Sequence, residues 1–135
     1  MGTALDPYLN FRSNARQAME FYREVFGGTL TIATFAEYQA SSDPSEDDLV
    51  MHASLEAPGG IRLMASDVPA SMELQQGTNV SLSLSGDSAD ELRGYFEKLS
   101  DGGSIIMPLE KAPWGDTFGM CVDRFGTRWM VNISG

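Results

Sequence analysis

The chain has 135 residues, with 19 acidic against nine basic side chains and a net charge of −10, a balance that repels phosphate backbones and anionic membrane surfaces and so argues against nucleic-acid or membrane partners. Its only cysteine, Cys121, excludes an internal disulfide, while the length allows one domain with a core that needs no structural metal. Neither a signal-peptide pattern nor a run of about 20 apolar residues occurs, so we expect a cytoplasmic protein.

The first half of the chain predicts a strand, a helix and three further strands. An extended segment, Tyr8–Phe11, precedes a helix that starts near Asn14, where the side chain can cap the first turn, and that ends at Gly27-Gly28. This helix is amphipathic because its apolar residues recur at positions 0, 3, 4 and 7: Ala18, Phe21, Tyr22 and Val25. The strands that follow, the last two joined by a Pro-Gly-Gly turn, are Leu30–Tyr38, Val50–Glu56 and Ile61–Ser66.

The second half repeats this order. The apolar helical pattern returns from Leu92 onwards, 74 positions after Ala18, in a helix that starts with a capping box at Ser88 and ends at Gly102-Gly103. Its strands are Asn79–Leu84 before the helix and, after it, Ser104–Leu109, Phe118–Val122 and Thr127–Ile133, the last two joined by a turn at Asp123–Gly126. We therefore predict an α+β fold in which one domain, residues 1–135, contains two modules, at about 5–68 and 77–134.

Alternation along the strands predicts two different faces in each half. In Asn79–Leu84, the side chains of Val80, Leu82 and Leu84 should face the helix, with Asn79, Ser81 and Ser83 opposite. The other strands divide in the same way and leave a face on which polar groups mix with methionine. This face is solvated if the sheets stay flat, and it lines a concave pocket if the two curl together.

Several segments together resemble a known family. They are Tyr8–Phe11, the Phe21-Tyr22 helix that ends at Phe26-Gly27-Gly28, His52-Ala53, Leu63–Asp67, Trp114–Gly119 and Asp123–Asn132. The chain is similar, over nearly its whole length, to the PhnB-like branch of the vicinal oxygen chelate superfamily, which contains glyoxalases, bleomycin-resistance proteins and extradiol dioxygenases. The resemblance implies paired βαβββ modules forming curled mixed sheets, and it implies no assigned reaction, since this branch generally lacks one.

The resemblance also implies where a metal would be held in the superfamily's enzymes. A histidine would stand where this chain has Asn79, one glutamate where it has Met130 and another near Met64, and the first strand offers only Pro7 or Tyr8. These side chains are poor donors for a hard divalent cation. We therefore expect neither a metal nor another cofactor.

His52, the only histidine, is the candidate catalytic residue. It should project from the polar side of its strand and could act as a general base or a single ligand. Glu56, the nearest carboxylate on that strand, would lie roughly 13 Å away. The alternative is a structural imidazole that is hydrogen-bonded to neighbouring strands or to a partner subunit.

Trp114 and Phe118 could form an apolar wall for a planar or alkyl ligand, or could instead plug a sheet edge or a subunit interface. Methionines suit varied apolar ligands, although they also fill core gaps. The candidate ligand-binding residues are His52, Met64, Asn79, Ser81, Trp114, Phe118, Met130 and Asn132.

Four functions remain open. The first is a homodimer that binds an unidentified small molecule without a metal. The second is an enzyme, metal-dependent or acid-base, that uses His52. The third is a structural or regulatory dimer whose sheet face is filled by its own side chains, and the fourth is glyoxalase-type isomerisation.

Overall fold

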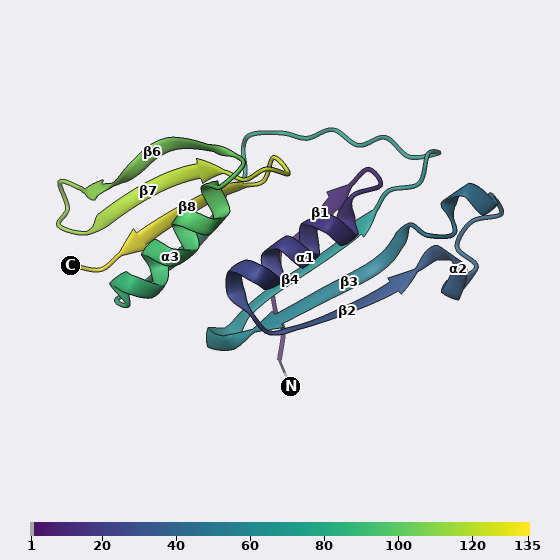
Figure 1. The fold of residues 1–135 in the computed structure, drawn as a ribbon, viewed down its shortest axis with the longest axis horizontal. Coiled ribbons are helices and arrows are strands. Elements are labelled where there is room, and N and C mark those ends of the chain that lie inside the picture. The colour runs from purple at the N-terminus through teal and green to yellow at the C-terminus, as the bar shows by residue number, and fades with distance from the viewer. Residues whose placement is uncertain (1) are drawn as a thin grey trace. The chain divides into compact units, whose positions relative to one another are not determined.

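The computed structural model describes residues 2–135, whose contacts group the chain into two compact units, one up to Gln75 and one from Gln76 onwards. Each unit is a four-stranded mixed sheet with one long helix across one of its faces (Figure 1). The predicted α+β class and the internal repeat are therefore confirmed. The organisation as a single domain stays a prediction, and the units are described one at a time.

Unit 1 has the strand order β1-β4-β3-β2, in which β1 runs parallel to β4 and the other neighbours are antiparallel. Helix α1 covers one face with an apolar stripe that contains Met19 and Tyr22, both fully buried. The elements are β1 (Tyr8–Phe11), α1 (Ala15–Phe26), β2 (Thr29–Thr34), α2 (Phe35–Tyr38), β3 (Val50–Ala57) and β4 (Ile61–Asp67), with 3₁₀ turns at Pro44–Glu46 and Pro58–Gly60.

Unit 2 repeats this topology in the order β5-β8-β7-β6, again with a parallel outer pair, β5 and β8. Leu92, Phe96 and Leu99 of α3 are buried on the sheet side that also buries Trp129 and Val131 of β8. The elements are β5 (Leu82–Gly86), α3 (Ala89–Ser100), β6 (Ser104–Lys111), β7 (Thr117–Val122) and β8 (Arg128–Ile133). No helix among residues 2–135 has the length and hydropathy needed to cross a membrane.

Two predicted strands differ from the structure by three or more residues at one end. The strand expected at Leu30–Tyr38 stops at Thr34, because the Thr34 hydroxyl accepts a hydrogen bond from the Glu37 N–H at 3.3 Å and so caps the short helix α2. The strand expected to start at Asn79 starts at Leu82. Val80, expected to face the helix, is instead 68% exposed, and Asn79 and Ser81 lie outside the sheet.

The helix starts are correct, but their predicted side-chain caps are not present. Neither Asn14 nor Ser88 makes a side-chain hydrogen bond to its helix. For α1 the acceptor is Asp67, at the end of β4, whose carboxylate takes the Ala15 N–H on Oδ1 and the Val50 N–H on Oδ2, each at 2.9 Å. Asp67 is 4% exposed, so this bidentate contact fastens the helix start to two strands inside the core.

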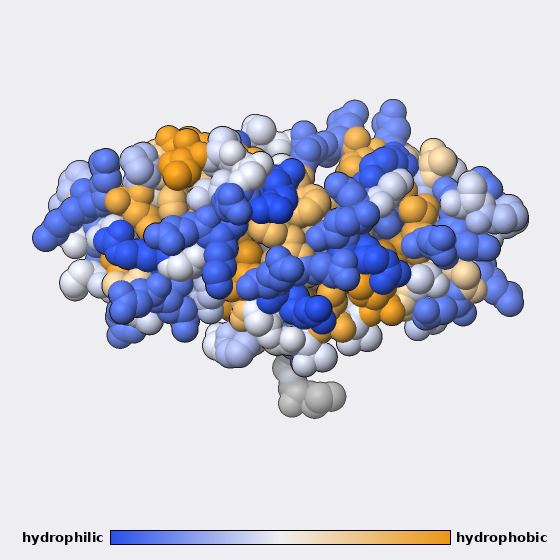
Figure 2. All heavy atoms as spheres, viewed as in Figure 1, coloured by the Kyte–Doolittle hydropathy of each residue, from blue (hydrophilic) through white to orange (hydrophobic). Residues whose placement is uncertain are grey.

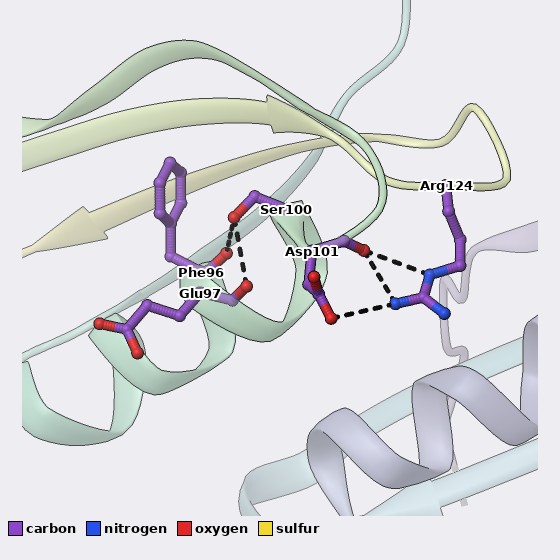
Figure 3. A network of polar contacts seen from close by, with 5 residues as sticks. All are labelled: Phe96, Glu97, Ser100, Asp101 and Arg124. Carbon is purple, nitrogen blue, oxygen red and sulfur yellow. Dashed lines mark hydrogen bonds and ion pairs between the residues drawn. The ribbon is translucent and has the colours of Figure 1, made fainter.

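Helix α1 ends at the predicted glycine pair, and α3 ends at Ser100, with Asp101 between it and Gly102-Gly103. The second glycine of each pair passes against a strand. A Cβ on Gly28 would overlap the Glu56 carbonyl, and a Cβ on Gly103 would overlap the Val122 carbonyl. The end of α3 is also tied to the β7–β8 turn, where the Arg124 guanidinium donates to the Asp101 carbonyl at 2.9 Å (Figure 3). The repeat thus extends to the close contact between helix end and sheet.

Candidate functional site

The side of each sheet opposite its helix carries the predicted mixture of polar groups and methionine. In β8 the side chains of Trp129 and Val131 are buried on the side of α3, so Arg128, Met130 and Asn132 project from the other side. We call this side of the sheet the open face of unit 2. By register it also contains Ser83, Ser85, Met107, Glu110, Phe118, Met120 and Val122.

A row of thioethers crosses this open face. Met130 pairs with Ser83 on one side and with Met120 on the other, and Met120 pairs with Met107 of β6. Neighbouring strands lie about 4.8 Å apart, so the methionine side chains are adjacent. Flexible, polarisable thioethers form a surface that adapts to ligands of different shape.

Trp114 and Phe118 lie together at the hairpin between β6 and β7. Their rings are 5.7 Å apart at an edge-to-face angle of 66°, and Trp114 is 62% exposed. Both line a pocket of about 250 Å³. Its other walls are Ile106, Met107, Pro108, Glu110, Lys111, Ala112 and Pro113. Apolar side chains over β6 also reach the surface, where Figure 2 shows an orange patch among blue.

Asn132 connects this corner to the end of the chain. It pairs with Phe118 across β7 and β8, and its amide Nδ2 donates to Oδ2 of Asp116 at 3.0 Å. The Gly135 N–H donates to the other carboxylate oxygen at 3.0 Å. The hydrogen bond from Asn132, followed by that from Gly135, lowers the pKa of Asp116. The carboxylate therefore holds the turn next to Trp114 in place.

In unit 1 the structure brings His52 and Met64 together through Tyr8. Tyr8 pairs with Met64 in the parallel register of β1 and β4, and its hydroxyl lies 3.4 Å from Nδ1 of His52. The imidazole is exposed, and within residues 2–135 no carboxylate forms an ion pair with it. His52 thus has a phenol beside it and lacks the acidic partner that orients a catalytic base.

Cys121 is buried in the sheet of unit 2. Burial, together with the nearby charge of Asp123, raises the pKa of the Cys121 thiol to about 11. A thiol with so high a pKa is almost entirely protonated at neutral pH and is a weak nucleophile. The finding agrees with the predicted role of Cys121 as a small buried apolar residue.

The residues at the expected metal positions do not fit a metal. Tyr8 beside Met64 in unit 1 corresponds to Ser83 beside Met130 in unit 2. A phenol, hydroxyls and thioethers are poor ligands for a hard divalent ion. Within the described residues, no three His, Cys, Asp or Glu side chains group closely enough to hold a metal ion.

Ser83 stands beside Met130 in the sheet, whereas Asn79, the residue expected there, lies before the start of β5. The 74-residue offset between the two helical patterns points to the strand of Ser83, although not to the residue itself. Applied to Tyr8, this offset leads to position 82, one residue from the serine that pairs with Met130.

Comparison with known proteins identifies the family. The profile of the Glyoxalase/Bleomycin resistance protein/Dioxygenase superfamily matches residues 4–131. Protein YjdN from Escherichia coli strain K12 is 27% identical over 96% of this chain and 94% of its own length. The crystal structure of PA1353 from Pseudomonas aeruginosa is 38% identical, covers 98% of both chains and has a TM-score of 0.82.

The PhnB protein from Bacillus cereus shares the fold with a TM-score of 0.76, at 24% identity over 98% of this chain and all of its own. The expectation drawn from the sequence motifs is thus confirmed. The chain belongs to the glyoxalase, bleomycin-resistance and dioxygenase superfamily.

Proposed function

We propose that this protein binds a small organic molecule through side chains of its sheets, without a metal in the site. The observation that carries the proposal is the corner of unit 2 where Trp114 and Phe118 line one pocket, with Met107 in its wall and Asn132 next to Phe118. Aromatic rings supply contact area for a planar group, and the neighbouring thioethers adapt to what extends beyond it. Met130 continues this surface across the sheet.

The volume of the pocket limits what it can hold. At about 250 Å³ it is smaller than the roughly 300–1,000 Å³ typical of sites for drug-sized ligands. A single aromatic ring or a short alkyl group fits this space. A longer ligand would continue over the open face of unit 2.

The other candidate residues are less directly supported. His52 and Met64 share the contact with Tyr8 in unit 1 and remain candidate ligand-binding residues there. Asn79 and Ser81 precede β5 and stay predictions. An acid-base enzyme that uses His52 is not favoured, because no carboxylate of the described residues pairs with the exposed imidazole.

The proposal is tested by a ligand titration with a neutral planar probe, indole, followed through methyl NMR of the methionines. Saturable shifts at Met107 and Met120, with buried Met19 of unit 1 unchanged, are the expected result. Trp114→Ala should weaken binding, whereas Tyr38→Ala, which removes another exposed aromatic ring, should not. An indole titration that leaves every methionine signal in place contradicts the proposal, and so does equal loss of affinity in the two variants.

Homodimer formation and a cytoplasmic location belong to the same proposal. Light scattering of the purified protein gives its mass in solution directly. A monomeric mass across the concentrations used for ligand titration would leave ligand binding intact and remove the dimer from the proposal.

A further inference from the structure

Arg128 stands out on the open face of unit 2 because a nitrogen of its guanidinium group is buried without a partner among the described residues. In a chain with 19 acidic and nine basic residues, no ion pair of the described residues involves Arg128. Its Nε is shut off from solvent and has no hydrogen-bond partner within residues 2–135. A buried donor without a partner costs free energy unless a ligand or water satisfies it.

The position of Arg128 on the sheet decides which side chains a ligand bound to its guanidinium would also contact. Arg128 pairs with Val122 and precedes Met130 by two residues on the same face of β8, a separation of about 7 Å along the strand. Asn132 and Phe118 lie one step further, about 13 Å from Arg128. A cation, an apolar surface and an aromatic corner therefore follow one another across the sheet (Figure 1 shows the strands).

The opposite corner has the opposite charge. Glu110 of β6 pairs with Phe118, so it lies diagonally across the open face from Arg128. Two strand spacings and four residues separate the two, roughly 16 Å, which excludes an ion pair between them. The Glu110 carboxylate would repel a second anionic group at that end of a ligand. The single guanidinium of Arg128 balances one negative charge, so the face suits a ligand with one anionic group.

We infer that the ligand of this face is an organic monoanion with an apolar body, whose carboxylate binds the Arg128 guanidinium while its body lies over Met130 and Met120 towards Phe118. This inference rests on the proposed function and adds the chemical class of the ligand. Arg128 supplies fork-shaped donors that match a carboxylate, and the thioethers supply adaptable apolar contact. Binding of this ligand involves no covalent step.

The test compares 4-phenylbutyrate with its uncharged analogue 4-phenylbutyramide, by calorimetry and by methyl NMR of the methionines. The acid should bind at least about tenfold more tightly than the amide, because a charge-assisted hydrogen bond is worth at least that ratio. Shifts should reach Met130 and Met120 and spare Met19. Arg128→Gln should abolish the difference between acid and amide, and Arg128→Lys, which keeps the charge, should restore part of it.

The matched control is Arg93→Gln, which removes the same charge from the exposed surface of α3, the helix that covers the other face of this sheet. It should leave the preference for the acid unchanged. Equal affinity for acid and amide, an unchanged preference in Arg128→Gln, or no binding of 4-phenylbutyrate overturns the inference. The indole titration is independent of Arg128 and decides separately whether the proposed function itself fails.

Discussion

The indole Nε1–H of Trp129 donates a hydrogen bond of 2.8 Å to Oδ2 of Asp123, inside the core of unit 2. The other oxygen of this carboxylate accepts the N–H groups of Phe125 and Thr127, at 2.8 and 3.1 Å. Asp123 is 3% exposed. One buried side chain thus shapes the β7–β8 turn and at the same time fixes the largest side chain under α3. The strand that this arrangement holds in register also carries Arg128 and Met130.

Replacing Asp123 by alanine should lower the free energy of unfolding by about 3 kcal/mol, because the buried Trp129 N–H and two partly buried backbone N–H groups lose a charged acceptor. Trp129→Phe removes one of the three bonds and should cost less. Asp101→Asn is the matched control: its side chain is 81% exposed and pairs with Arg124, so a change within about 0.5 kcal/mol is expected. Urea unfolding measures all three, and an Asp123→Ala protein as stable as the control would refute the assignment.

Local patterns account for how much of the fold was predictable. The 3.6-residue spacing of apolar residues, which includes Phe96 and Leu99, predicts the helices. The two-residue alternation seen in β8 predicts the strands and their faces. Asp67 as the cap of α1 was out of reach, since its partner Ala15 lies 52 residues away. Local capping rules consider only side chains close to the helix start in sequence, whereas the acceptor for α1 is a buried carboxylate from a distant strand.

The candidate site was predictable in part, for a related reason. Alternation placed Met130 and Asn132 on one face, and the structure adds which residues stand beside them. Asn79 lies before β5, and Ser83 pairs with Met130 because of where β5 meets β8, which a single sequence does not show. The burial of the Arg128 Nε without a partner among the described residues depends on tertiary packing, which the sequence pattern does not show.

Two glycines near α3 should respond to alanine with opposite signs. Gly103→Ala would drive a Cβ into the Val122 carbonyl, so we expect a loss of about 2–3 kcal/mol. Gly94 lies within α3, where a Cβ would meet nothing within 4 Å, and Gly94→Ala should stabilise the protein by about 1 kcal/mol. Thermal unfolding of the two variants checks both signs, and a Gly103→Ala protein of unchanged stability would contradict the close contact.

The carboxylate of Asp116 should titrate differently once Asn132 is removed. In the folded protein the hydrogen bond from Asn132, and then that from Gly135, holds the pKa of Asp116 below its ordinary value of 3.8. A carboxyl group whose pKa is lowered by folding stabilises the folded state at pH values above its ordinary pKa. That contribution disappears as the pH falls through the pKa of the folded state. Asn132→Ala should therefore raise the pKa of Asp116 towards 3.8, as measured by carboxyl ¹³C NMR.

Asp43 provides the internal control for this titration. Its pKa is lowered by hydrogen bonds from the side chain and the backbone N–H of Ser45 in unit 1, so it should not change in the Asn132→Ala protein. If Asp116 kept its lowered pKa without Asn132, the Gly135 N–H alone would have to account for the shift. If instead both carboxylates moved together, the substitution would have altered the fold beyond the turn that carries Trp114. Only a shift confined to Asp116 shows that the amide of Asn132 holds this turn through that carboxylate.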